Sequence, residues 1–376
     1  VLALCLEHPL PERARRARDL LRLGAAQLLF LETPAHAAVD STVTLAGGFR
    51  DSAGYKGLIN AVLRRIGREK AALLAAVPPG AASLPDWLWQ SWSATYGPRA
   101  AAIAEAVLHE APLDLSVKRP EEIARWAEAL HAEILPGGTL RLRPHEDDGE
   151  RPARITERPG YAEGAWWVQD FAASLPVKLL GAVAGKRVLD LCAAPGGKTA
   201  QLAAAGAEVT AIDRSADRLK RLEQNLARLQ LSAHCAAADA AVWNGAQDFD
   251  IVLLDAPCSA TGTLRRHPDV AWLKDPRDLP KLNAAQDRLI DAALRLAKPG
   301  GIVLYCVCSL QPEEGRARID AALKRHADAT HAPFDAGDAF GMGDLLTQDG
   351  DLRTLPCHLA EKGGMDGFYA ARLVKP

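Results

Sequence analysis

VLDLCAAPGGKT, residues 188–199, joins an apolar run to a glycine-containing turn, and a helix is predicted to begin at the end of that turn. Strands and helices are then predicted to alternate, with strands at 187–191, 208–213, 249–255 and 301–305 and helices at 197–205, 215–230 and 282–297. Such alternation is typical of a doubly wound parallel sheet. We therefore expect an α/β domain over residues 176–376, in which residues 367–373 form a last edge strand.

The chain before this domain has two different patterns. Residues 1–78 carry Ala, Leu and Arg at helical spacing, which predicts a small helical domain with helices over 12–31 and 56–65. Pro78-Pro79-Gly80 then marks a boundary. Residues 79–175 are predicted to be a small α+β insert, with helices at 98–110 and 120–134, strands at 113–117 and 139–142, and an acidic loop at 146–150.

Composition limits the functional classes. A hydrophobic fraction of 48% and a charged fraction of 24% describe an ordinary globular protein, and no apolar run approaches the roughly 18 residues of a membrane span. The seven cysteines are an odd number without a Cys-x-x-Cys pair, so we expect reduced thiols in a cytoplasmic protein and no metal site. A net charge of −2 excludes binding of polyanions by net charge, although local arginine clusters permit a nucleic-acid partner. Because the chain begins with Val1, we expect preceding residues to be missing.

The turn after the first α/β strand points to a nucleotide ligand without a pyrophosphate. A phosphate-binding P-loop would need glycine six residues before Lys198, where Cys192 stands, and the dinucleotide fingerprint Gly-x-Gly-x-x-Gly is absent. Asp213 ends the next strand, where a carboxylate can accept both ribose hydroxyls, although capping of the following helix is an equally good explanation. Asp239 follows a third strand and is placed to bind an adenine amine. Together with Asp190 and the turn glycines, these residues indicate S-adenosylmethionine.

Two cysteines at strand ends indicate the reaction. Cys258 ends Asp255-Ala256-Pro257-Cys258, where methyltransferases acting on base amines place an aromatic residue, and Cys308 follows the strand that begins near residue 301. C5 of a pyrimidine becomes nucleophilic only after a nucleophile adds to C6, and a thiolate suits that step because it also leaves readily. Asp255 is expected to bind N3 and the exocyclic amine, which favours cytosine over uracil. Spacing leaves open which cysteine attacks and which assists elimination.

Two other groups of residues near these motifs are interpreted separately. Cys306 lies deeper in the same strand as Cys308 and is expected to be packing. Arg265, Arg266 and His267 follow the Cys258 loop and are hypothesised to contact RNA phosphates near the target base.

The motifs together resemble the Sun (NOP2/NSUN-type) RNA cytosine-5 methyltransferases, including the bacterial members that act on small-subunit ribosomal RNA. The resemblance rests on residues 188–199, on 255–262 with 265–269, and on 308–314, and it extends to a NusB-like helical RNA-binding domain over residues 1–78 through 34–39 and 56–64. It implies a Rossmann-like fold for the catalytic domain, an RNA-binding role for the insert, and an N-terminal domain that lacks its first helix.

The resemblance also assigns roles to single residues. It implies that Cys308 is the nucleophile, that Cys258 serves product release, and that Lys198 and Asp255 act beside them. It implies that S-adenosylmethionine is bound by Cys192, Ala193, Ala194, Pro195, Gly196, Gly197, Lys198, Asp213, Arg218, Asp239 and Asp255. Two positions depart from the family pattern: Val307 stands where threonine is usual, and Ala240 where glycine is frequent.

We therefore expect an enzyme that forms 5-methylcytosine in small-subunit ribosomal RNA and acts as a monomer without a metal or a membrane partner. Two alternatives stay open at this point. One is a cytosine-5 methyltransferase acting on transfer RNA, and the other is a catalytically inert NusB-like RNA-binding or assembly factor. Retention of Asp255, Cys258 and Cys308 argues against inertness, because a binding protein needs no thiols at strand ends.

Overall fold

The computed structural model describes residues 1–31, 33–77, 83–142, 154–245 and 248–376, so the predicted acidic loop at 146–150 lies outside the described residues. The chain divides into two compact units, Val1–Ala82 and Ser83–Pro376. Within the described ranges, no helix is long and apolar enough to cross a membrane.

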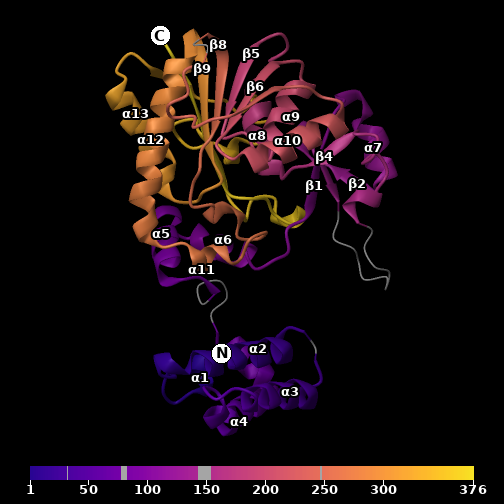
Figure 1. Cartoon of the computed structure of the whole chain (residues 1–376), viewed down its shortest axis with the longest axis vertical. Coiled ribbons are helices and arrows are strands. Elements are labelled where there is room, and N and C mark those ends of the chain that lie inside the picture. Colours follow the sequence, from indigo (N-terminus) through magenta and orange to yellow (C-terminus); the bar gives the residue numbers. More distant parts are fainter. Residues whose placement is uncertain (32, 78–82, 143–153, 246–247) are drawn as a thin grey trace. The chain divides into compact units, whose positions relative to one another are not determined.

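The first unit is helical, as predicted (Figure 1). Its helices are α1 (Leu2–Cys5), α2 (Arg15–Leu29), α3 (Ala35–Gly47) and α4 (Lys56–Ala75). The apolar stripes of α2 and α4 meet in a common core that contains Leu21, Ile59, Leu63 and Ile66, all fully buried. Packing of these amphipathic faces, rather than helix propensity, accounts for most of the stability of such short helices.

The second unit begins with a helical pair and a small antiparallel sheet. The elements are α5 (Asp86–Tyr96), α6 (Arg99–Ala106), β1 (Leu113–Val117), α7 (Ile123–Ala129), β2 (Ala132–Ile134), β3 (Leu140–Leu142) and β4 (Trp166–Val168), with strand order β2-β3-β1-β4. The helix predicted over 120–134 is wrong at its end, because His131 adopts a φ of 51° and the chain continues as β2. That left-handed conformation cannot continue a right-handed helix. The division at residues 175 and 176 stays a prediction.

The main sheet has the order β10-β12-β9-β8-β5-β6-β7, with β11 paired to β12. Its elements are α8 (Phe171–Lys178), β5 (Arg187–Leu191), α9 (Gly197–Ala204), β6 (Glu208–Asp213), α10 (Ala216–Leu229), β7 (His234–Ala237), β8 (Phe249–Asp255), α11 (Val270–Leu273), α12 (Leu279–Leu296), β9 (Ala297–Val307), α13 (Arg316–Arg325), β10 (Thr330–His331), β11 (Leu352–Thr354) and β12 (Phe368–Val374). The strands from β9 to β7 are parallel, which confirms the predicted α/β class. The edge-strand prediction is wrong, because β12 lies antiparallel between β9 and β10.

Helices cover both faces of this sheet (Figure 1). On one face, α12 and α13 bury alternate residues such as Leu254 and Tyr305, and on the other, α8 and α9 bury Val188 and Leu253. β5 lies between β6 and β8, so the direction of strand addition reverses at its end. Ligands of open α/β sheets bind at such a switch point, beyond the carboxyl ends of the strands.

Backbone pairing continues beyond the ends of β8 and β9. The amide of Ala256 donates to the carbonyl of Cys306 (2.9 Å), and the amide of Gly262 donates to the carbonyl of Cys308 (3.1 Å). Gly262 also accepts from the amide of Gly367 (2.8 Å), so three segments meet here with no room for a side chain. A Cβ atom at Gly262 would lie 1.9 Å from the carbonyl oxygen of Gly367.

We predict that Gly262→Ala lowers the free energy of unfolding of the second unit by about 1–3 kcal/mol, the usual cost of overpacking. Chemical denaturation measures this change. The control is Gly343→Ala, whose added Cβ would meet only the Cβ of Ala336 at 3.9 Å and should change stability by less than about 0.5 kcal/mol. Equal stability of the two variants would contradict the close approach.

Candidate active site

The glycine turn after β5 forms one wall of a cavity. Gly196 has a φ of 102°, and a Cβ there would lie 2.6 Å from Leu222, so glycine is required on both grounds. Asp213 at the end of β6 accepts from the amides of Ala194 (3.1 Å) and Ser215 (2.9 Å). The helix N-cap is Ser215 rather than Asp213, so the capping explanation of Asp213 is wrong. Asp213 instead fixes the shape of the turn.

The cavity has a volume of about 1220 Å³ and runs along the carboxyl ends of the strands. That volume exceeds the ~300–1,000 Å³ of a typical small-molecule pocket, so the cavity has room for a cofactor and part of a larger substrate. Of the predicted cofactor residues, its wall contains Cys192, Ala194, Pro195, Asp213, Arg218, Asp239 and Asp255. Ala193, Gly196, Gly197 and Lys198 do not line it; they shape the turn and the start of α9 behind the wall.

Arg218 and Asp239 both make hydrogen bonds within this wall. The Arg218 guanidinium donates to the carbonyl of Ala194 and lies 3.2 Å from the Asp213 carboxylate, so it ties α10 to the turn. The exposed Asp239 accepts from the amide of Ala241 (3.0 Å).

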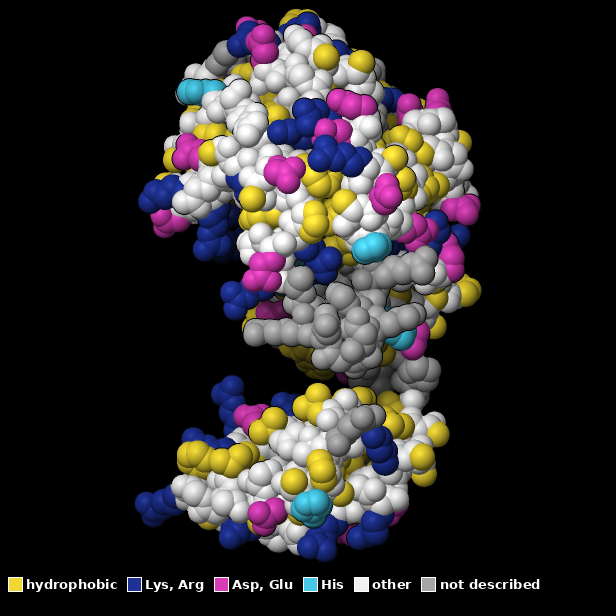
Figure 2. All heavy atoms as spheres, turned by 90° about the vertical axis from the view of Figure 1, so that its right-hand side faces the viewer, with side chains coloured by type: hydrophobic (Ala, Val, Ile, Leu, Met, Phe, Trp, Pro, Cys, Tyr) yellow, Lys and Arg dark blue, Asp and Glu magenta, His cyan; other side chains and the backbone are white. Residues whose placement is uncertain are grey.

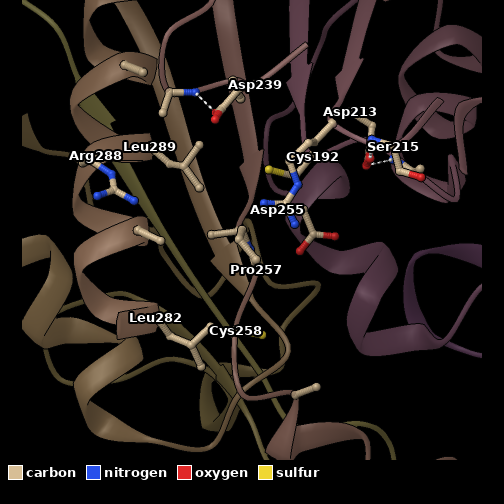
Figure 3. A pocket seen from close by; sticks show the side chains of 18 of the residues that line it. Cys192, Asp213, Ser215, Asp239, Asp255, Pro257, Cys258, Leu282, Arg288 and Leu289 are labelled. Atoms are coloured by element: carbon tan, nitrogen blue, oxygen red, sulfur yellow. Dashed lines mark hydrogen bonds between the residues drawn. The ribbon is translucent and has the colours of Figure 1, made fainter. Parts of the chain in front are cut away.

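The opposite wall comes from α12, which was predicted as a helix but not as part of a site. Leu282, Arg288 and Leu289 project from it toward Asp255 and Cys258, and face Cys192 and Asp213 across the cavity (Figure 3). Their signal in the sequence was a stripe at helical spacing, completed by the small residues Ala285 and Ala292.

The two predicted catalytic cysteines meet at the floor of the cavity. The Sγ atoms of Cys258 and Cys308 lie 3.5 Å apart, within hydrogen-bond distance for sulfur, and both side chains are partly exposed to the cavity. The hydrogen bond with Cys308, together with burial and nearby negative charge, raises the pKa of Cys258 well above its usual value. Cys258 therefore keeps its proton near neutral pH, and either sulfur can be the donor in this contact.

Lys198 and Asp255 form an ion pair beside the cysteines. Lys198 Nζ lies 2.7 Å from Asp255 Oδ2, and its ammonium also lies 4.8 Å from the ring centroid of Phe368. Burial alone would lower the pKa of Lys198, but the charge of Asp255, its hydrogen bond with the lysine, and the neighbouring Cys306 and Asp190 together outweigh burial and raise the pKa, so the lysine is a cation. Cys306, which was predicted to be packing, is fully buried, and its Sγ lies 3.8 Å from Asp255 Oδ1.

Asp190, interpreted from sequence as part of the ligand site, lies instead beneath it. The side chain is fully buried and accepts from Thr199 Oγ1 (2.6 Å), and Oδ1 has no partner among the described residues. Burial raises the pKa of Asp190 to about 7. The group is therefore mostly neutral below that pH.

The hypothesis that Arg265 and Arg266 contact RNA phosphates is wrong. Arg265 is 7% exposed and donates to the carbonyl of Gly363 (2.5 Å), and Arg266 pairs with Asp170 (2.8 Å) and Asp366 (3.1 Å). Arg265 is buried and Arg266 is ion-paired within the fold, and only His267 of the three is exposed.

The chain resembles known proteins along its whole length. Residues 177–374 match the family described as 16S rRNA methyltransferase RsmB/F, and residues 1–68 match the NusB family. A ribosomal RNA small subunit methyltransferase B of Erwinia tasmaniensis is 38% identical over 386 residues that cover 100% of this chain and 86% of that protein.

Two solved structures share the fold. The crystal structure of PH0851 has a TM-score of 0.74 at 24% identity and covers 96% of this chain and 82% of its own. A methyltransferase homologue from Pyrococcus horikoshii has a TM-score of 0.60 at 26% identity, with 77% of this chain and 94% of its own covered.

We predict that Asp190→Asn makes stability less dependent on pH. A raised folded-state pKa means that the folded state binds more protons than the unfolded state between pH 4 and 7, so wild-type stability falls as pH rises through that window. Between pH 5 and 8 the titration of Asp190 lowers the free energy of unfolding of the wild type by roughly 3 kcal/mol at most. The amide of Asp190→Asn does not titrate, so this loss is absent from the variant. Thermal melts across pH measure the change.

The control for this pH effect is Asp217→Asn, because that side chain is 91% exposed. Its melting temperature should follow the wild-type pH dependence. An Asp190→Asn profile parallel to that of the wild type would contradict the assignment.

Proposed function

Because the chain belongs to the RsmB/F family of 16S rRNA methyltransferases, we propose that it methylates C5 of a cytosine in small-subunit ribosomal RNA through a covalent adduct on Cys308. The observation that carries the proposal is the 3.5 Å approach of two thiols from neighbouring strand ends at the floor of the cavity. A base-amine methyltransferase has no use for that pair.

The cavity wall fits S-adenosylmethionine. Asp213 and Asp239 offer carboxylate oxygens at the ends of β6 and β7, and the backbone of the Cys192–Pro195 turn approaches the same space. Asp213 accepts two backbone amides and retains lone pairs for ribose hydroxyls. When bound, the cofactor supplies an electrophilic methyl group on sulfur.

Asp255 orients the base. Lys198 holds Oδ2, so the carboxyl group faces the cavity in a fixed rotamer. It can accept from the exocyclic amine of cytosine, and from N3 once that nitrogen is protonated in the adduct, whereas uracil presents a carbonyl in place of the amine and would repel the carboxylate. Lys198 therefore acts on the base through Asp255.

The two thiols act in sequence. Cys308 adds to C6 as the thiolate, forming the S–C6 bond, and the electrons of the C5–C6 double bond make C5 nucleophilic toward the methyl group. In the elimination, Cys258 gives its proton to the departing Cys308 sulfur and takes up the proton of C5. The S–C6 bond breaks, the double bond forms again, and the proton count balances.

The helical unit supplies the expected surface for RNA. Four exposed arginines lie on this unit: Arg64 and Arg68 on α4, Arg15 at the start of α2, and Arg13 just before it. Most charged side chains seen on this unit in Figure 2 are Lys or Arg, whereas both signs are interspersed on the same face of the second unit. Phosphate contacts supply most of the affinity in such an interface.

We predict opposite behaviour of the two cysteine variants. Cys308→Ala should lose activity by more than about 10³-fold and form no adduct, because the nucleophile is removed. Cys258→Ala should accumulate an RNA–protein adduct stable to denaturation, because addition proceeds and elimination does not. Denaturing gels with labelled RNA measure both, and Cys235→Ala, outside the cavity wall, is the matched control. An adduct that persists in Cys308→Ala would reverse the assignment.

The substrate is tested by deleting the gene and sequencing bisulfite-treated RNA. We predict that one or more 5-methylcytosines disappear from small-subunit ribosomal RNA and return with the wild-type gene but not with Cys308→Ala. Loss confined to transfer RNA would favour the transfer RNA enzyme instead. No loss, together with no calorimetric affinity for S-adenosylmethionine, would favour the inert RNA-binding factor.

A further inference from the structure

A fully buried carboxylate lies behind the two cysteines. Glu314 ends a short 3₁₀ helix, Pro312–Glu314, and its relative exposure is 0%. Oε1 accepts from the amide of Ser259 (2.9 Å) and from Gln286 Nε2 (3.0 Å). Oε2 accepts from the hydroxyls of Ser259 and Ser309, both at 2.5 Å. Each oxygen therefore has strong donors, as a buried carboxylate requires.

These donors connect the two catalytic loops. Ser259 follows Cys258 in sequence, and Ser309 follows Cys308. The two serine hydroxyls also lie 3.0 Å from each other, and Thr261 Oγ1 accepts from the amide of Leu310 (3.1 Å). The loops are thus joined by a continuous set of hydrogen bonds with Glu314 at its centre.

Glu314 is itself held in place by the scaffold. Gln286 belongs to α12, and its amide also donates to the carbonyl of Pro257 (3.0 Å). Tyr305 of β9 donates from its hydroxyl to the carbonyl of Glu314 (2.7 Å). Glu314 is therefore held by α12 and β9, and through its hydrogen bonds it holds both loops.

A buried charge seldom makes a fold more stable than apolar residues of similar size would. Its advantage is geometric, since charge-assisted hydrogen bonds are short and directional. In this fold the important distance is that between the two sulfurs, because they must reach adjacent atoms, C6 and C5, of one base.

We propose that Glu314 is a positioning residue that clamps the Cys258 and Cys308 loops, so that both thiols face one pyrimidine ring at the required separation. The role in methyl transfer rests on the proposed function; the clamp itself does not. Glu314 touches neither substrate nor cofactor in this role, and it acts through Ser259 and Ser309.

The first test is Glu314→Gln, which keeps the shape but turns one acceptor atom into a donor that faces other donors. We expect kcat to fall about 100-fold, the usual cost of misplacing reacting groups by about 1 Å, with KM for RNA and Kd for S-adenosylmethionine within twofold of wild type. In the Cys258→Ala background, Glu314→Gln should slow adduct formation to a similar extent. The control is Glu313→Gln, an exposed neighbour with the same change of charge.

A second measurement needs no substrate. Hydrogen exchange followed by mass spectrometry should show faster exchange in peptides spanning 256–263 and 309–315 of Glu314→Gln than of Glu313→Gln, because the Ser259 amide loses its acceptor. If the wild type fails to methylate ribosomal RNA, the proposed function fails, and this measurement still decides the clamp.

Several outcomes would overturn the clamp. These are a kcat of Glu314→Gln within threefold of wild type, an equal loss in Glu313→Gln, or unchanged exchange in both loops. If Glu314→Gln no longer binds cofactor, the double variant Ser259→Ala/Ser309→Ala tests the clamp in its place. It keeps the charge and removes the two hydroxyl bonds, and kcat at least tenfold below wild type with cofactor affinity retained supports the clamp. Wild-type kcat overturns it.

Discussion

The parallel pairing of β8 with β9 is the constraint on which the site depends. Its register places Asp255 opposite Cys306, so the residues that follow both strands leave the sheet together. The backbone bonds from Ala256 and Gly262 to the carbonyls of Cys306 and Cys308 extend that pairing into the loops. Two cysteines fifty positions apart in sequence are therefore adjacent, because a shared ladder determines where both loops begin.

The region before the α/β sheet also supports the catalytic floor. Trp92 of α5 donates to Gln311 (3.0 Å), and the hydroxyl of Tyr96 donates to the carbonyl of Leu310 (2.6 Å), just after Cys308. Arg141 of β3 pairs with Asp114 of β1 and donates to the carbonyl of Gly364 (2.7 Å). These contacts explain why Ser83–Pro376 forms one compact unit. A single fold thus carries both the sheet and the supports for its loops.

Local patterns were enough to predict the main elements of the sheet, the glycine turn, and the approach of Cys258 and Cys308. Each depends on periodicity or on strand ends, which are visible within about ten residues. The structural role of Arg266 and the contacts of Glu314 were missed because their partners lie 100 and 55 positions away. The two carboxylates Asp190 and Asp213 look alike in sequence, but only Asp213 reaches the cavity, because Asp190 lies inside a buried strand while Asp213 ends one.

The charge beneath the cysteines bears on the protonation of Cys258. The hydrogen bond to Cys308 and burial raise the pKa of Cys258, and the charge of Glu314 adds to that effect. A cation in the position of Glu314 would favour the Cys258 thiolate. The Glu314 carboxylate instead adds to the cost of ionising Cys258. The group that joins the two loops therefore also helps to keep Cys258 protonated, as the role proposed for Cys258 in elimination requires.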